Sequence, residues 1–440
     1  MNFIDRFFKI SERGSTARTE IVAGITTFAA MSYIVAVNPI ILSQTGMDRA
    51  GLVSVTIITT VISTLLMGLY SNMPIAAAPA MGTNTYFAVI ICAGMGLGWR
   101  QALAVTFYNG IVFLIISVCG IREKIIKSLP NPLRISLQCG IGLFIAFMGL
   151  AQSGIIEASP NTLVALGDLK SPQAILTLLG FSAMAFMLVR KVRGAIIYSI
   201  LAITAAAFFI HSKDGAALAQ VPDKIVSMPA SISETFLALD FMYPLRDIKA
   251  ALPVIFTLLL LDMFDTIGTL VALCNRLGLA DKEGETRGMG KAMVVDSSAT
   301  IIGALLGTST VTCFVESAAG VEDGAKTGLA AIATSACFCA ALFFTPAISA
   351  IPAFATAPAL ILVGIAMMGG ISGLNVKDPA EHIPAVFCMM MIMLTFSITK
   401  GFAFGIVIYV IMMAATSRIK SITAPTWVLF FMLLIFLLAL

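Results

Sequence analysis

The sequence predicts an all-α polytopic membrane protein with about 14 transmembrane spans. Of its 440 residues, 59% are hydrophobic and 11% are charged, and the mean hydropathy is +1.00. Average soluble domains carry about 25% charged residues. A chain this apolar has too few polar residues to cover a water-facing surface of its size. The composition therefore excludes a soluble enzyme, a nucleic-acid binder and a disordered scaffold.

Apolar runs long enough to cross a bilayer follow one another along the chain, since a membrane helix needs roughly 20 apolar residues. The first seven runs cover about 21–42, 51–69, 75–96, 99–119, 133–151, 172–189 and 195–211. The next seven cover about 250–273, 291–306, 308–320, 326–345, 355–371, 383–399 and 401–416. A short final run at 425–440 follows a polar break and lies outside this plan of fourteen spans.

The distribution of basic residues predicts the orientation of the chain. With a cytoplasmic N-terminus, 19 of the 27 Lys and Arg residues fall in cytoplasmic segments and eight on the opposite side, as the positive-inside rule requires. Residues 1–20 are polar and charged and contain no apolar signal core, so we expect the first span to direct insertion. The expected location is the cell inner (plasma) membrane.

Two short similarities between the halves of the chain indicate an internal repeat. Residues 194–198 (GAIIY) resemble 405–409 (GIVIY), and residues 82–85 (GTNT) resemble 307–310 (GTST). Seven spans per copy is an odd number, so the two copies would be antiparallel, as in the inverted repeats of many secondary transporters. Chance similarity between apolar segments is the alternative explanation.

Spans 3 and 10 are expected to be interrupted helices. Span 3 reads PIAAAPAMGTNTYFAV, in which Thr83 and Asn84 follow Pro79, and span 10 reads LLGTSTVTCFVESAAG around Glu316. Stretches this rich in Thr, Ser, Gly and Pro make poor continuous helices. Irregular backbone at membrane depth needs partners from protein or a watery cavity, and its occurrence in both halves points to a midplane binding site. Close helix packing through small residues is the alternative.

Three carboxylates lie inside these apolar runs: Asp262 and Asp265 in span 8, and Glu316 in span 10. A charge at the bilayer centre costs at least ~2.5–3.5 kcal/mol, so such residues are expected to bind a proton, an ion or a substrate. Asp262 and Asp265 stand three positions apart, on neighbouring parts of one helical face. For Asp262 the alternative is a supporting hydrogen bond. Asp296, near the start of span 9, is expected to be a helix N-cap.

Spans 8 and 10 contain no Lys or Arg to neutralise these acids. Carboxyl groups without a cationic partner suit a carrier that moves protons with its substrate. The rival interpretation is a sodium site, because carboxylates and hydroxyls also bind hard cations. No cofactor and no resident metal are expected.

Several motifs are similar to those of one known family. They read RTEIVAGITTFAAMSYIVAVNP (residues 18–39), AAAPAMGTNTYFAV, LDMFDTIGTLVAL, GALLGTSTVTCFVESAAGVEDGAKTGLAA and FATAPALILVGIAMM. These stretches resemble the azaguanine-resistance-type purine permeases, a branch of the nucleobase:cation symporter-2 (nucleobase/ascorbate transporter) superfamily. The resemblance extends from about residue 18 to residue 417.

This resemblance implies a proton-coupled symporter, not an enzyme, that imports purine nucleobases (adenine, or guanine/hypoxanthine) by alternating access. It implies fourteen spans in two inverted seven-span repeats that form a core domain and a gate domain. The core domain would comprise 18–120 (spans 1–4) and 250–346 (spans 8–11), and the gate domain 121–249 (spans 5–7) and 347–416 (spans 12–14). A cytoplasmic segment, 1–17, and a C-terminal segment, 417–440, flank them. The expected partners are a purine nucleobase, protons, the lipid bilayer and a second copy of the chain, but no nucleic acid.

The resemblance also implies site residues. The substrate-binding set would be Asn84, Thr83, Asp265, Glu316 and the backbone around Phe314 and Val315. Proton coupling would fall to Asp265, Glu316 and Asp262, because Thr269 stands where related uracil permeases have a histidine. A purine has flat apolar faces, on which Tyr86, Phe87 or Phe264 are candidates to stack.

Three other functions were weighed against this one. An anion carrier of the same fold, for sulfate, bicarbonate or a dicarboxylate, would favour positive groups or bare helix N-termini, and three acids without Arg or Lys argue against it. An intramembrane aspartyl protease needs paired aspartates from two helices, whereas the second helix here supplies a glutamate. A channel fits the interrupted helices and the membrane acids less well than a carrier.

Overall fold

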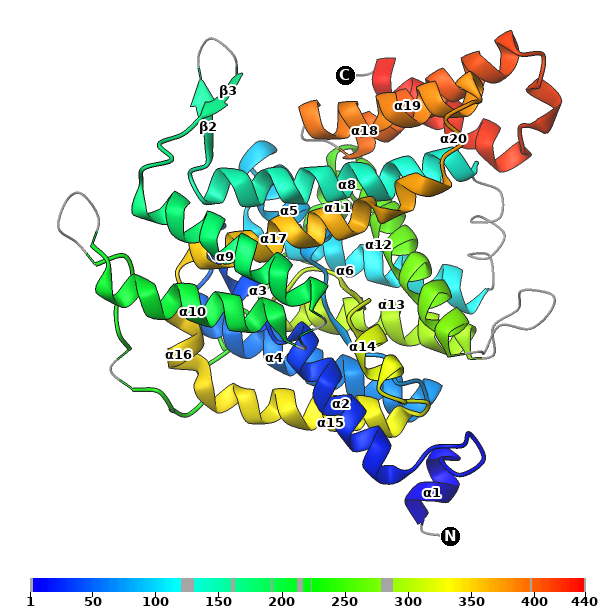
Figure 1. The fold of residues 1–440 in the computed structure, drawn as a ribbon. Coiled ribbons are helices and arrows are strands. Elements are labelled where there is room, and N and C mark those ends of the chain that lie inside the picture. Colours follow the sequence, from blue (N-terminus) through cyan, green and yellow to red (C-terminus); the bar gives the residue numbers. More distant parts are fainter. Residues whose placement is uncertain are drawn as a thin grey trace. The chain divides into compact units, whose positions relative to one another are not determined.

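The computed structural model describes residues 3–119, 130–159, 163–190, 192, 194–211, 217–222, 224–277, 288–395 and 398–438. These residues form mainly helices (Figure 1). The chain divides into two compact units. Unit 1 comprises Met1–Val118 and Asp168–Pro358, and unit 2 comprises Cys119–Gly167 and Ala359–Leu440. The core and gate domains expected from the sequence are defined by movement, and that division stays a prediction.

Unit 1 begins with a short N-terminal helix, which is followed by the elements of the first four expected spans. They are α1 (Phe3–Phe8), α2 (Ala17–Met31), α3 (Ile34–Ser43), α4 (Arg49–Leu66), the π-helix η1 (Met67–Ser71), β1 (Ala77–Pro79), α5 (Met81–Thr85), the π-helix η2 (Tyr86–Gly94) and α6 (Trp99–Val118). The first span is thus divided into α2 and α3 by a turn at Ser32 and Tyr33.

Unit 1 continues after Gly167. Its further elements are α9 (Pro172–Val189), α10 (Ala195–Phe209), α11 (Tyr243–Arg246), α12 (Ile248–Arg276), α13 (Met289–Leu306), β4 (Val311–Cys313), α14 (Ser317–Glu322), α15 (Gly328–Ala341), the 3-10 turn η3 (Leu342–Phe344), α16 (Thr345–Ser349) and the start of α17 (Ala353–Met367). The long helix α12 carries Asp262 and Asp265, as expected for span 8.

Short polar side chains begin several of these helices. Asp48 Oδ2 accepts the N–H of Gly51 at 2.6 Å before α4, and Ser171 Oγ accepts the N–H of Ala174 at 3.3 Å before α9. The first N–H groups of a helix have no partner within the helix, and such caps satisfy them. The boundaries of these spans are therefore encoded locally.

Small residues bring the helices of unit 1 into close contact. α2 packs against α15, where a Cβ at Gly24 would overlap the carbonyl oxygen of Ala330. A Cβ at Gly328 would likewise overlap the backbone of Gly68. In a membrane, where lipid is as apolar as the side chains, close packing of this kind holds helices together.

Unit 2 contains α8 (Asn131–Gln152), the hairpin strands β2 (Ile156–Ser159) and β3 (Leu163–Leu166), the rest of α17, the 3-10 helix η4 (Met368–Gly373), α18 (Pro379–Thr395), α19 (Ile398–Ala415), η5 (Ile419–Ser421) and α20 (Ala424–Leu438). α8 packs against α18, and α18 against α19. The final apolar run of the sequence forms α20, up to the end of the described residues at 438.

Eight helices within the described ranges are long and apolar enough to cross a membrane, and four shorter apolar helices accompany them. The structure therefore confirms a helical multi-pass protein. The finer expectation of fourteen spans is not settled by these helices.

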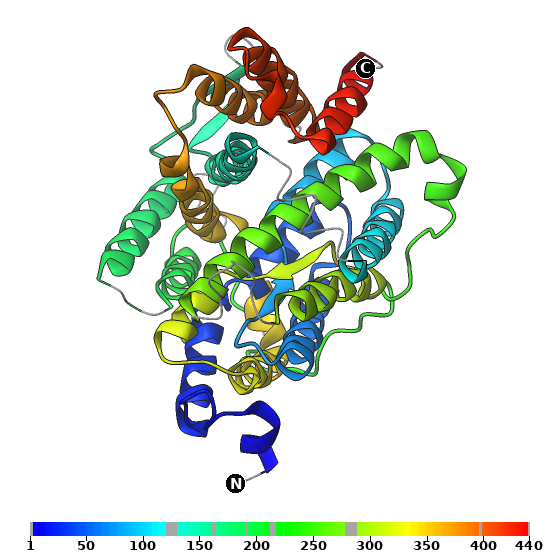
Figure 2. The ribbon, with the colours of Figure 1, turned by 90° about the vertical axis from the view of Figure 1, so that its right-hand side faces the viewer.

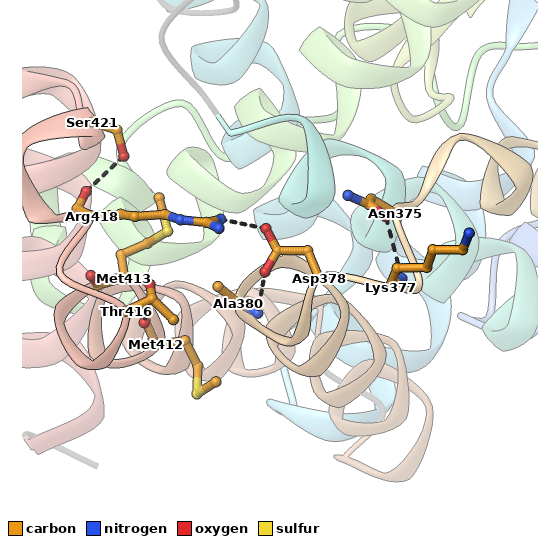
Figure 3. Close-up of polar contacts among 9 residues, drawn as sticks. All are labelled: Asn375, Lys377, Asp378, Ala380, Met412, Met413, Thr416, Arg418 and Ser421. Carbon is orange, nitrogen blue, oxygen red and sulfur yellow. Dashed lines mark hydrogen bonds and ion pairs between the residues drawn. The ribbon is translucent and has the colours of Figure 1, made fainter.

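An ion pair joins the two ends of the α18–α19 pair in unit 2 (Figure 3). Asp378, just before α18, accepts a hydrogen bond from the guanidinium of Arg418, which follows α19. Asp378 Oδ1 also accepts the N–H of Ala380 at 3.0 Å. The Arg418 hydrogen bond and the Ala380 N–H hold the pKa of Asp378 below its ordinary value, because both favour the charged carboxylate.

This lowered pKa predicts a pH-dependent contribution to stability. A carboxyl whose pKa is depressed in the fold stabilises it above the pKa of the unfolded chain, about 4, and loses this effect as pH falls through the folded value. Arg418→Gln should therefore lower the unfolding temperature slightly at about pH 7, and the difference should shrink as the pH falls below about 4. Thermal unfolding of purified protein across this range tests it, with Lys420→Gln as the control. An equal deficit at every pH would contradict the assignment.

Candidate functional site

The two interrupted spans meet as a pair of antiparallel strands. β1 and β4 align Ala77 with Cys313 and Pro79 with Val311; β4 is the yellow-green arrow in Figure 2. The pairing extends at both ends, because the N–H of Ala80 donates to Thr310 O and the N–H of Phe314 donates to Ala76 O, each at 2.9 Å. The predicted interruptions of spans 3 and 10 are therefore present, and they contact each other.

Threonine hydroxyls satisfy the outer edges of this strand pair. Thr64 Oγ1 on α4 donates to the carbonyl of Ala77 and accepts its N–H, both at 3.1 Å. Thr300 Oγ1 on α13 donates to the carbonyl of Val311 at 3.0 Å and accepts its N–H at 3.2 Å. Unpaired backbone groups in the membrane interior cost several kcal/mol, so these hydroxyls make the extended segments tolerable there.

These contacts change the correspondence between the two halves. Residues 82–85 follow β1, whereas residues 307–310 precede β4, so the similarity between these two stretches does not match one strand with the other. Thr64 on α4 and Thr300 on α13 instead make the same pair of contacts, each with one residue of a strand. The internal repeat stays a prediction.

Glu316 lies directly after the β4 segment, at the residue that precedes α14. Its Oε1 accepts a hydrogen bond from the hydroxyl of Tyr33 at 2.5 Å. The Glu316 side chain is partly accessible, and its neighbour Val315 is 54% exposed. Within the described part of the chain the N–H of Val315 donates to no acceptor. Glu316 and Val315 are therefore placed to meet a ligand.

Asp265 is the second accessible acid of the site. Its side chain is partly exposed and lies within electrostatic range of Glu316 and of Asp296. The sequence predicted that Asp265 and Glu316 belong to one site, and α12 and α14 do pack against each other. Two carboxylates from different helices thus face one region.

Asp262 is only 1% exposed. Its Oδ2 accepts a hydrogen bond from the side-chain amide of Asn109 on α6 at 2.7 Å. Its Oδ1 has no hydrogen-bond partner among the described residues, although the side chain of Thr310 lies close by. Asp262 is therefore buried next to Thr310, the residue that precedes β4. Its direct role in proton coupling stays a prediction.

The expectation that Asp296 is a helix N-cap is wrong. α13 begins at Met289, so Asp296 lies well inside the helix, and it is completely buried. Its Oδ2 accepts a hydrogen bond from Thr266 at 2.7 Å, and its Oδ1 accepts the thiol of Cys313 at 3.7 Å. The helix begins before the apolar run at 291–306. Gly288, Met289 and Gly290 carry no strong capping signal, so the sequence does not indicate this earlier start.

Asn84 has internal partners on both ends of its side-chain amide. Its Nδ2 donates to Asn38 Oδ1, and its Oδ1 accepts the hydroxyl of Ser309. Asn38 in turn donates to Thr56 at 2.7 Å and to Thr308 at 3.3 Å. Both asparagines are completely buried. The geometry favours Asn84 as a support that joins the first, third and tenth spans, and its direct contact with a ligand stays a prediction.

Other predicted substrate contacts are also occupied internally. Thr83 is 3% exposed, and its hydroxyl bonds that of Thr310 at 2.5 Å. Phe314 is buried, and its N–H is taken by Ala76. Phe87 and Tyr86 are buried as well, and the side chain of Phe264 lies outside the described residues. Of the predicted set, the structure leaves Asp265, Glu316 and Val315 accessible.

The sequence did not single out Tyr33, Asn38 and Asn109 as site residues, whereas Thr266 was expected to lie close to Asp265. The available signal was a polar side chain within an apolar run, which applies to Asn38 and Asn109. Tyr33 gave no such signal, because a tyrosine in a membrane helix is usually read as an interfacial residue. Only the turn between α2 and α3 reveals that its hydroxyl is aimed at Glu316.

Comparison with known proteins agrees with this geometry. The family model Xan_ur_permease, described as "Permease family", matches residues 18–406. The chain belongs to this permease family. The resemblance drawn from the sequence motifs is thereby confirmed, and the protein is a transporter, not an enzyme.

Two curated relatives cover nearly the whole permease. The adenine permease AdeP of Escherichia coli is 36% identical over 420 residues, which is 96% of this chain and 92% of that protein. The guanine/hypoxanthine permease PbuO of Bacillus subtilis is 39% identical over 424 residues, which is 94% of this chain and 96% of that protein.

The fold is shared with a solved transporter structure. The transmembrane domain of the cyanobacterial bicarbonate transporter BicA superimposes with a TM-score of 0.65, and the match covers 92% of this chain and 98% of that domain. The sequences are 13% identical, so this likeness concerns the fold alone.

The Asn84 contacts predict a variant whose main defect is structural. Asn84→Ala leaves Asn38 Oδ1 and the Ser309 hydroxyl without this partner, and each unsatisfied buried group costs about 1–3 kcal/mol. We expect a clearly lower unfolding temperature in the absence of ligand, measured on purified protein. Asn131→Ala, at an exposed position, is the control. Natural stability combined with lost ligand binding would show instead that Asn84 contacts the ligand.

Proposed function

We propose that this permease imports purine nucleobases across the cytoplasmic membrane together with protons, by alternating access. The observation that carries the proposal is the pair of partly exposed carboxylates, Glu316 and Asp265, beside the crossing of the two interrupted spans, where β1 pairs with β4. Relatives at 36% and 39% identity over most of the chain are named as adenine and guanine/hypoxanthine permeases. Their names supply the substrate class, and the site supplies chemistry that suits it.

The accessible acids suit the hydrogen-bonding edge of a purine. Glu316 accepts from ring or exocyclic N–H groups, and its charge strengthens such a bond. The exposed side chain of Val315 offers apolar surface to a ring face, and its N–H is a donor for a ring nitrogen or a carbonyl oxygen. A base bound at Glu316 is therefore held by charge-assisted hydrogen bonding and apolar contact together.

Coupling to protons follows from the two carboxylates. Asp265 and Glu316 lie within electrostatic range of each other. A proton bound by either carboxyl therefore removes the repulsion between the two negative charges. One charge moving through ~100 mV releases about 2.3 kcal/mol. This energy supports roughly fifty-fold accumulation of a neutral base.

The proposal includes the finer architecture. The matching contacts of Thr64 with β1 and Thr300 with β4 support two inverted seven-span repeats, because α4 and α13 would be the second spans of the two copies. Arg13 donates to the carbonyl of Lys326 at 2.7 Å, which supports the assignment of both residues to one membrane side. With basic residues concentrated there, the N-terminus is cytoplasmic. Movement of a gate domain against a core domain would expose the site alternately.

Anion transport is the second candidate, because the shared fold occurs in a transporter named for bicarbonate. The sequence from 250 to 275 and from 301 to 325 contains no Lys or Arg. Three carboxylates without a cationic partner would repel an anion. The same oxygen ligands also suit sodium, and the uptake experiment separates sodium coupling from proton coupling.

Uptake into cells that lack their own purine permeases tests the proposal. Radiolabelled adenine, hypoxanthine, guanine and uracil are supplied with and without a protonophore, and with and without sodium. We expect saturable uptake of a purine that collapses with the protonophore and survives sodium removal. Entry of no purine would refute the substrate class, and uptake that ignores the proton gradient would refute the coupling.

Glu316→Gln should abolish purine uptake, although the protein still reaches the membrane. The amide presents a donor where the base edge needs an acceptor, and a charged acceptor is lost as well. Glu157→Gln makes the same change at an exposed position of unit 2 and should leave uptake unchanged. Initial rates normalised to membrane protein measure both. Natural uptake by Glu316→Gln would remove Glu316 from the site.

A further inference from the structure

Tyr33 is a polar residue of the first span to which the proposed transport chemistry assigns no role. It lies in the turn between α2 and α3, and its side chain is completely buried. A buried phenol hydroxyl needs a hydrogen-bond partner. It finds that partner across 283 residues of sequence, in the carboxylate of Glu316.

The contact commits one of the two carboxylate oxygens. The Tyr33 hydroxyl donates to Oε1 of Glu316 at 2.5 Å, a length typical of an O–H donor bound to a charged acceptor. The Tyr33 hydroxyl holds Oε1, and the backbone N–H of Glu316 itself also interacts with the carboxylate. A carboxylate oxygen accepts more than one hydrogen bond, so Oε2 can still accept from a ligand. A phenol both donates and accepts, so the contact is compatible with a charged and with a protonated Glu316.

Few ionisable groups compete for this carboxylate among the described residues. α2 and α12 pack against α14. From α12, Asp265 faces Glu316, and Asp296 of α13 faces Asp265 in turn. The acid of α2, Glu20, lies at the other end of that helix and accepts the N–H groups of Lys326 and Thr327. Tyr33 is therefore the neutral donor in a group of acids.

The first span holds both interrupted segments at once. Tyr33 binds the segment after β4 through Glu316, and Asn38, on the same span, binds the segment after β1 through Asn84. Tyr33 immediately precedes α3, which carries Asn38, so the contacts with Glu316 and with Asn84 come from adjacent parts of one span. Such a support restricts a binding group to its productive geometry.

We propose that Tyr33 is a positioning residue for the substrate: it engages Oε1 of Glu316 and so presents Oε2 to the N–H groups of the nucleobase. This inference rests on the proposed function. It deepens that proposal by assigning to the first span the orientation of the ligand-binding carboxylate.

Tyr33→Phe removes this one hydroxyl and keeps the ring. A hydrogen bond to a charged group is worth about a tenfold effect or more, so we expect KM for the transported purine to rise about tenfold with little change in Vmax. The charged carboxylate also loses a donor that favours it. The acid limb of the pH dependence of KM should therefore differ from that of the natural protein.

Exchange of labelled purine in proteoliposomes, with equal pH on both sides, measures KM without a driving gradient. Tyr198→Phe, at an exposed position of α10, is the matched control and should behave as the natural protein does. A Tyr33→Phe profile identical to the control would overturn the positioning role. A fall in Vmax alone, with KM and the acid limb unchanged, would also overturn it, because that result indicates a structural role.

The outcome is separable from the proposed function. If the natural protein exchanges no purine, the proposed function fails and this inference falls with it; if the natural protein and Tyr198→Phe exchange purine, only Tyr33 is under test. Should Tyr33→Phe not reach the membrane, 3-fluorotyrosine incorporated at position 33 keeps the contact. Its single fluorine resonance should shift when the purine is added, and an unmoved resonance would overturn the proposal.

Discussion

Two helices broken inside a membrane are the constraint on which the rest of this structure depends. An interrupted helix exposes N–H and C=O groups that hydrocarbon cannot satisfy. The permease meets the demand by pairing β1 with β4 and by aiming Thr64 and Thr300 at the outer edges of the pair. Many polar residues of the neighbouring helices therefore satisfy backbone and side-chain groups at this crossing of the two interrupted spans, whether or not a ligand is bound.

The acids near the crossing divide into two kinds. Asp262 and Asp296 are buried and accept hydrogen bonds from Asn109, Thr266 and Cys313. These bonds connect helices and a strand, and a role of Asp262 in proton coupling stays a prediction. Asp265 and Glu316 are partly exposed, and their contact with a ligand or a proton stays a proposal. A membrane carboxylate is therefore a sign of a site, but burial and partners decide whether it binds the cargo or supports the residues that do.

The shared fold shows how little of the function the architecture itself specifies. The BicA domain has the same arrangement at 13% identity, and it belongs to a protein named for an anion. In this permease the crossing of the two strands is surrounded by carboxylates, hydroxyls and amides.

The sequence by itself determined the membrane class and the interrupted spans, and it singled out Asp265 and Glu316 as candidate site residues, because hydropathy, helix-breaking residues and buried charge are local properties. It did not reveal that Asn84 and Thr83 face inward, that Asp296 lies inside α13, or that Tyr33 binds Glu316. Those facts depend on contacts between segments up to 283 residues apart. Only the tertiary structure brings such segments together, and whether a polar side chain meets protein or ligand depends on what lies opposite it.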